Sequence, residues 1–218
     1  METAYGGENV ILSSGDVTIP IPHEAMAFFE NRDGILSEWG MLIKLGLLKV
    51  KPALVQEISA VRQKMFAPDE KVLGVLLRGT DYVAEQPYEH PIPPPVEFAA
   101  SIVFDKLQEW NCNKIFLATE DKNIVQIFKQ SFGDFCVTFD RKYVDYKPRQ
   151  TISLVRIARP NDYFQQGKDY LTQMVLLSMC NSFVAARCSG STAVMMLADK
   201  FEHTYFFNLG RYGMITLD

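Results

Sequence analysis

The sequence lacks the residue clusters that metal and redox sites need. It has only three histidines, at positions 23, 90 and 203, and none of its four cysteines belongs to a Cys-x-x-Cys pair. Structural zinc sites draw on closely spaced cysteines and histidines, so we predict no metal site. Three of the cysteines lie in or beside apolar runs, which is typical of reduced thiols in the core of a cytosolic protein.

Signals for targeting and for membrane insertion are also missing. Residues 1–8 are polar and acidic, with neither the basic nor the apolar region of a signal peptide. The apolar runs are shorter than the roughly 20 residues that cross a bilayer, so we expect no membrane span and a cytoplasmic location. A formal net charge of −4 argues against a broad nucleic-acid-binding surface, and we expect no nucleic acid as partner.

Two glycine-rich phosphate-binding motifs are absent as well. The sequence contains neither Gly-x-Gly-x-x-Gly nor a Gly-Lys-Ser/Thr loop. Their absence argues against a dinucleotide dehydrogenase and against a P-loop NTPase. A phosphate ligand would therefore need a site of another kind.

The chain does contain enough apolar residues for a sizeable core, in a regular alternation of strand and helix patterns. It has 218 residues, of which 48% are hydrophobic and 22% charged. We expect a helical segment at 1–70, ending in a helix from Pro52 to Met65, and a Rossmann-like α/β domain at 71–218 with a parallel sheet and flanking helices. Strands are predicted at 72–77, 114–118, 135–139, 182–186 and 204–208, with a short further strand at 152–157. Helices are predicted at 96–110, 122–132, 170–179 and 193–199, and a proline-rich loop at 82–95.

The first candidate binding residues follow the apolar strand at 72–77. Arg78, Gly79, Thr80 and Asp81 come directly after it, and ligands of open α/β sheets bind at the carboxyl ends of strands. A guanidinium there offers a planar, permanent charge that suits phosphate, and Gly79 permits a close backbone approach. Thr80 offers a hydroxyl, and Asp81 can brace Arg78 or accept a hydrogen bond from a ribose. A surface ion pair in a tight turn explains the same four residues when they are taken alone.

A second candidate lies between the strand at 182–186 and the next helix. Ser189, Gly190, Ser191 and Thr192 combine small side chains with three hydroxyl groups. The amino terminus of a helix binds anions through its N–H groups and dipole. An ordinary helix cap accounts equally well for these residues.

Carboxylates supply the remaining candidates. Glu120 and Asp121 follow the strand at 114–118, where helix capping is sufficient to explain at least one of them. Glu85 lies in the loop after Asp81 and could act as a general base if an acceptor hydroxyl reached it, although glutamates in loops are more often simply solvated.

Taken together, these segments resemble the fucosyltransferase superfamily, which includes α1,2-, α1,6-, protein O- and nodulation-factor fucosyltransferases. The segment 74–81, GVLLRGTD, resembles the family's Gly-Val-His-Val-Arg-Arg-Thr-Asp motif. The segment 116–121 is similar to its Leu-Ala-Thr-Asp-Asp element, and 170–191 to its late apolar helix, strand and serine-rich turn. The three matches occur in the family's order over residues 70–210, although the lysine that follows the family's aspartate is Tyr82 here.

The resemblance implies the donor-binding, carboxyl-terminal half of a GT-B glycosyltransferase. It implies transfer of fucose from GDP-fucose to a glycan hydroxyl, as in polysaccharide synthesis, without a metal or other cofactor. Arg78 then matches the arginine at the donor β-phosphate, Asp81 the aspartate that closes the motif, and Ser189 the serine at the diphosphate. Glu85 lies near the family's glutamate and is the candidate base.

Two other interpretations remain open. One is a non-catalytic nucleotide-sugar-binding module that lacks its acceptor half, since some 70 residues before the α/β domain are too few for a second Rossmann-like domain. The other is an unrelated flavodoxin-like protein that binds a different phosphorylated ligand at the same strand ends.

Overall fold

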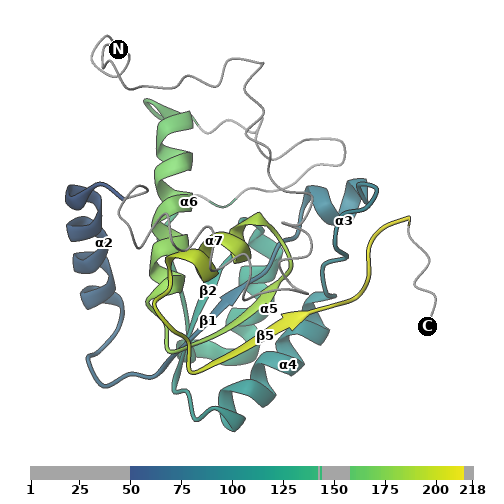
Figure 1. Ribbon diagram of the computed structural model, residues 1–218, viewed down its shortest axis with the longest axis horizontal. Helices are drawn as coiled ribbons and strands as arrows, with labels where there is room; N and C mark the ends of the chain where they lie inside the picture. Colours follow the sequence, from purple (N-terminus) through teal and green to yellow (C-terminus); the bar gives the residue numbers. More distant parts are fainter. Residues whose placement is uncertain (1–49, 142, 144–157, 214–218) are drawn as a thin grey trace.

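A five-stranded sheet organises the part of the chain that the computed structural model describes, residues 50–141, 143 and 158–213 (Figure 1). All neighbouring strands are parallel, in the order β3-β2-β1-β4-β5. The strands are β1 (Val72–Leu76), β2 (Lys114–Ala118), β3 (Cys136–Thr138), β4 (Ser182–Ala186) and β5 (His203–Phe207). The predicted Rossmann-like parallel sheet is therefore confirmed.

The direction in which strands are added to the sheet reverses next to β1. Strands β2 and β3 follow on one side of β1, and the chain then returns so that β4 pairs with the other side of β1. Leu76 lies beside Ala118 on β2 and Ala185 on β4, so the loops after all three strands leave the same edge. In open α/β sheets, ligands bind at the point where the order reverses, which here lies between β1 and β4.

Two layers of helices cover the sheet because the strand side chains alternate between its faces. On one face, Phe116 and Phe183 are fully buried against α6 (Asp162–Ser178) and α7 (Ser189–Leu197). On the other face, the strands pack against α4 (Val96–Glu109) and α5 (Lys122–Phe132). The central strands are therefore buried on both faces, as is usual for parallel sheets with helices on both sides.

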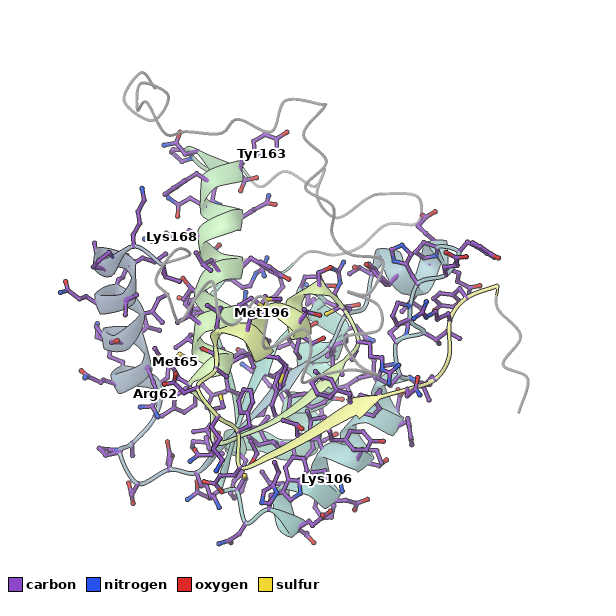
Figure 2. The ribbon with its side chains drawn as sticks, in the orientation of Figure 1. Arg62, Met65, Lys106, Tyr163, Lys168 and Met196 are labelled. Atoms are coloured by element: carbon purple, nitrogen blue, oxygen red, sulfur yellow. The ribbon has the colours of Figure 1, made fainter. Side chains whose placement is uncertain are left out.

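Helix α2 (Pro52–Met65) lies on the outer side of α6, away from the sheet (Figure 1). Its buried residue Ile58 joins the α6 core, and Phe66 packs edge to face against Phe116 with ring centroids 5.9 Å apart. A 2.7 Å ion pair between Glu57 and Lys168 also links α2 to α6. Figure 2 shows Lys168 on the upper part of α6, with Arg62 and Met65 on α2 below it.

The structure differs most from the predicted elements at the start of two helices and in one predicted loop. Helix α6 begins at Asp162 rather than 170, and it continues through Gly167. It starts early because the guanidinium of Arg159 bonds the carboxylates of Asp162 and Asp169, at 2.7 and 3.1 Å, across its first two turns. Helix α7 begins at Ser189 rather than 193, so the predicted serine-rich loop is the first turn of the helix. The loop predicted at 82–95 contains a short helix, α3 (Asp81–Glu85).

Several predictions fall on other parts of the chain. Most of the predicted helical segment at 1–70 and the strand at 152–157 lie outside the described residues. Within residues 50–141 and 158–213, no helix has the length and apolar character needed to cross a bilayer.

Candidate functional site

The loop after β1 holds Arg78 at the carboxyl edge of the sheet. The guanidinium carbon of Arg78 lies 4.4 Å from the centre of the Tyr82 ring, and the Tyr82 ring meets His90 edge to face at 5.3 Å. Arg78 Nε lies 3.4 Å from Oε1 of Glu120, which follows β2. A cation on an aromatic face and beside a carboxylate is held in a defined direction, and 22% of the Arg78 side chain stays exposed.

Glu120 holds the β1 loop in place. Its Oε1 accepts hydrogen bonds from the Gly79 N–H and from the Thr80 hydroxyl, both at 3.3 Å. An ionised carboxylate is an acceptor only, so Glu120 supports the loop rather than binding a phosphate itself. Burial raises the pKa of Glu120, and the neighbouring Arg78 charge opposes the shift without cancelling it.

Asp121 joins the same loop to helix α5. Its Oδ1 accepts from the Asn123 N–H at 2.7 Å and so caps the helix, while Oδ2 accepts from the Thr80 N–H at 3.3 Å. A Cβ atom on Gly79 would clash with Oδ2 of Asp121. The sequence therefore needs glycine at 79 so that the two loops can meet.

Thr80 adopts a backbone conformation that is rare for a β-branched residue, with φ 53° and ψ −119°. Such geometry costs on the order of 1–3 kcal/mol and persists only where its surroundings enforce it. Here the Thr80 side chain is buried, and its N–H and hydroxyl are both hydrogen-bonded to the carboxylates after β2. The turn directs the chain from β1 into α3.

The amino terminus of α7 forms the other side of the switch point. Cys188 is its N-cap, and the Ser191 hydroxyl both accepts from the Cys188 N–H at 3.0 Å and donates to the Cys188 carbonyl at 2.8 Å. The Thr192 hydroxyl donates to the same carbonyl at 3.3 Å. Of the three predicted hydroxyl groups, these two serve the cap, whereas Ser189 is exposed at the first position of the helix.

The hydroxyl of Tyr170 also lies at this helix terminus. Tyr170 was not among the residues predicted from the sequence. A Cβ atom on Gly190 would lie only 2.6 Å from Tyr170 Oη and 3.3 Å from the Met174 sulfur. Gly190 thus allows α6 and α7 to approach closely. The contact joins residues 20 positions apart on two helices, and no local sequence pattern would have indicated it.

Two of the predicted catalytic residues lie on α3. Asp81 is the first residue of this helix, and only its backbone is described. Glu85 is the last residue of α3, and its side chain is exposed. The structure therefore brings Arg78, Gly79, Thr80, Glu120 and Asp121 into direct contact and leaves Glu85 at the surface nearby.

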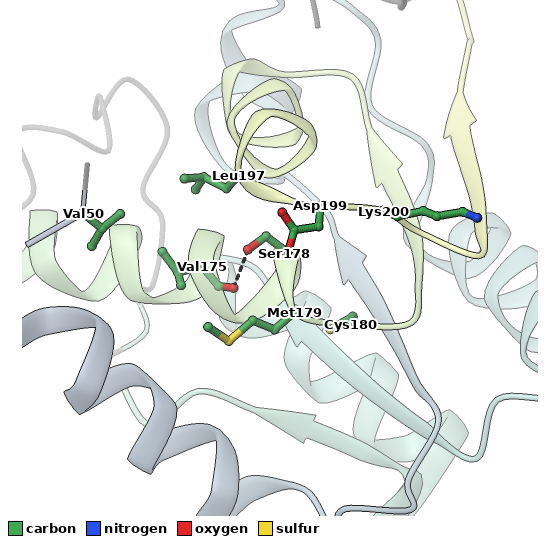
Figure 3. A pocket seen from close by; sticks show the side chains of 8 residues that line it. All are labelled: Val50, Val175, Ser178, Met179, Cys180, Leu197, Asp199 and Lys200. Carbon is green, nitrogen blue, oxygen red and sulfur yellow. Dashed lines mark hydrogen bonds between the residues drawn. The ribbon is translucent and has the colours of Figure 1, made fainter. Parts of the chain in front are cut away.

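Two pockets lie elsewhere in the described region. One, of about 590 Å³, is lined by residues of α2 and the first half of α6, including Leu54 and Phe164. The other, of about 380 Å³, lies where α6 ends before β4, between Met179 and Leu197 (Figure 3). The end of α6 precedes β4, so this second pocket lies toward the edge of the sheet opposite the Arg78 loop. Neither pocket includes a predicted site residue.

Comparison with known proteins places this geometry in a known fold. No family profile matches the chain, and neither does any curated protein sequence. Among solved structures, POFUT1 in complex with GDP-fucose is similar, with 12% identity, a TM-score of 0.52, and coverage of 78% of this chain and 49% of that one. POFUT1 in complex with GDP has 11% identity and a TM-score of 0.52, and the match covers 81% of this chain and 51% of that one. NodZ alpha-1,6-fucosyltransferase, from Bradyrhizobium, has 16% identity and a TM-score of 0.47, and the match covers 76% of this chain and 48% of that one.

The similarity to POFUT1 shows that the chain shares the fold of a protein in the superfamily that its motifs resemble. The chain spans about half the length of the solved structures that it matches. Among the described residues, no group of three or more His, Cys, Asp or Glu side chains is arranged to hold a metal ion.

Proposed function

We propose that this chain binds the diphosphate of GDP-fucose between β1 and β4 and takes part in the transfer of fucose to a glycan hydroxyl. One observation carries the proposal: Arg78 is held by Tyr82 and Glu120 at the topological switch point, in a fold shared with POFUT1. Ligands of such sheets bind at this point, and a POFUT1 structure contains GDP-fucose.

Arg78 has the chemistry that departure of GDP requires. As the bond between the sugar and the β-phosphate oxygen breaks, negative charge grows on the leaving diphosphate. A cation fixed beside that oxygen stabilises the transition state more than the ground state. Because Tyr82 and Glu120 already orient the guanidinium, little reorganisation is needed during the reaction.

The other predicted residues complete the proposal. The Gly79 and Thr80 backbone and the first turn of α7, with Ser189 and Gly190, surround the diphosphate, while Glu120 and Asp121 hold the β1 loop. Asp81 supports the motif, and Glu85 accepts the proton of the acceptor hydroxyl as that oxygen bonds to the sugar. Arg78 rather than a divalent cation neutralises the leaving group, so added EDTA should leave turnover unchanged.

A second candidate function is a nucleotide-sugar-binding module without catalysis of its own. The observation that favours it is that the residues in direct contact, around Arg78 and Glu120, are those assigned to the donor, whereas the candidate base Glu85 is exposed at the surface. Hydrolysis of GDP-fucose separates the two functions: turnover that Arg78→Lys abolishes supports the enzyme, whereas binding without turnover supports the module.

Thermal unfolding with a panel of ligands tests the shared donor site. At a hundredfold excess over its dissociation constant, a ligand stabilises the native state by about 2.7 kcal/mol, or about 5–11 °C in Tm for a chain of this size. GDP and GDP-fucose should produce this shift, and UDP-glucose and FMN should not. A response to FMN alone would support the flavodoxin-like interpretation, and no response to either guanine nucleotide would overturn the proposal.

A further inference from the structure

The hydroxyl of Tyr170 is placed to take part in anion binding at the amino terminus of α7. It lies so close to Gly190, the second residue of that helix, that any side chain there would collide with it. The first N–H groups of a helix have no acceptor within the helix and favour an anion beside them. Tyr170 is 43% exposed as a whole residue, so its side chain borders on solvent, while its hydroxyl end lies against Gly190.

The same point on α7 also meets β1: the Cβ position of Gly190 that lies 2.6 Å from the Tyr170 hydroxyl lies 3.3 Å from Leu76, two residues before Arg78. Burial raises the pKa of Tyr170 to about 12, with Cys188 and Glu120 adding to the rise and Arg78 opposing it. Tyr170 therefore keeps its proton at neutral pH and can donate a hydrogen bond. Its surroundings combine a cation from the β1 loop with a helix terminus from the β4 loop.

We propose that Tyr170 donates its hydroxyl hydrogen to a phosphate oxygen of the bound diphosphate, opposite Arg78. This inference rests on the proposed function and adds a binding residue to it. Arg78 holds the diphosphate from the β1 loop, and Tyr170 with the first turn of α7 holds it from the β4 side. Tyr170 therefore recognises the diphosphate and not the nucleoside.

The variant Tyr170→Phe tests this role, because it removes only the hydroxyl and keeps the aromatic ring. The matched control is Tyr163→Phe on the same helix, two turns earlier, where the side chain is 69% exposed and lines the pocket between α2 and α6. GDP affinity is measured by calorimetric titration of the 218-residue chain. Affinity for inorganic pyrophosphate is measured by its competition with GDP.

We expect Tyr170→Phe to lower the affinities for GDP and for pyrophosphate by the same factor, about tenfold. This is the loss expected when a hydrogen bond to a charged group is removed. Tyr163→Phe should change either affinity less than twofold. A lower Tm with unchanged affinities would show that the hydroxyl only supports α7 and would overturn the inference.

Two further results would also overturn it. One is that Tyr170→Phe lowers the affinity for GDP but not the affinity for pyrophosphate. The other is that pyrophosphate fails to compete with GDP in the unmodified protein. If the unmodified protein bound no GDP at all, the proposed function would fall together with this inference. Unchanged GDP binding by Tyr170→Phe would remove this inference alone.

Discussion

The contact between Gly79 and Asp121 gives a sharp test of how the site is built. In Gly79→Ala, the new Cβ atom would clash with Oδ2 of Asp121 and lie 3.0 Å from its Cβ and Cγ atoms. The Asp121 side chain is short, and hydrogen bonds from the N–H groups of Asn123 and Thr80 fix both of its oxygens. The substitution therefore displaces Asp121 from both partners.

The cost follows from the two hydrogen bonds that are lost. Loss of the α5 cap costs about 1 kcal/mol, and a buried N–H left without an acceptor costs about 1–3 kcal/mol. We expect Gly79→Ala to lower the free energy of unfolding by about 2–4 kcal/mol, which corresponds to a fall in Tm of about 4–16 °C. GDP affinity should fall as well, because the β1 loop carries Arg78.

Urea denaturation of four variants completes the test. Gly167→Ala is the control: it lies inside α6 with nothing within 4 Å of the new methyl group, so we expect a gain of about 0.5–1 kcal/mol. Asp121→Ala removes the clashing Oδ2 and Cγ but keeps the Cβ atom at 3.0 Å, so adding Gly79→Ala to it should cost clearly less than Gly79→Ala alone. If Gly79→Ala matched the unmodified protein, or if its cost added in full to that of Asp121→Ala, the reasoning would be wrong.

Three other predictions concern charge, packing and thiol reactivity. The raised pKa of Glu120 means that the native state holds its proton more tightly than the unfolded state. Stability should therefore fall as pH rises from 4.5 through the native pKa, and Glu120→Gln should remove that fall in urea titrations at several pH values. Phe116→Ala should cost about 3–5 kcal/mol, whereas Phe104→Ala, 51% exposed on α4, should cost under about 0.5 kcal/mol; equal losses in Tm would contradict the core assignment. Burial raises the pKa of Cys136 to about 11 and of Cys180 to about 12, so mass spectrometry should find both unalkylated by iodoacetamide at pH 8 until the protein unfolds.

Much of the fold could be predicted because local patterns and tertiary packing agree. The strands at 114–118 and 182–186 are short apolar runs, and α5 begins after its cap Asp121 and ends before Gly133, where φ is 53°. Helix α7 was predicted to begin too late because its N-cap is Cys188, a residue that is not among the preferred caps. The early start of α6 depends on ion pairs that Arg159 makes with two acidic residues of the helix.

The candidate site was only partly predictable for a similar reason. Strand ends indicated Arg78 and the two carboxylates after β2, because parallel strands bring their carboxyl ends together. The sequence could not show that Glu120 and Asp121 hold the β1 loop, since these contacts join residues about 40 positions apart. The contact between Tyr170 and Gly190 depends on how closely two helices pack, which no residue pattern records.

Calorimetric titration of GDP into the unmodified protein and into Arg78→Lys tests the central claim most directly. Lysine keeps a positive charge beside Glu120, so folding should be retained, but it loses the planar fork that suits phosphate. We predict that Arg78→Lys weakens GDP binding about tenfold or more, while Arg62→Lys on α2 leaves it unchanged. Equal GDP affinity for Arg78→Lys and the unmodified protein would contradict the placement of the diphosphate at the switch point between β1 and β4.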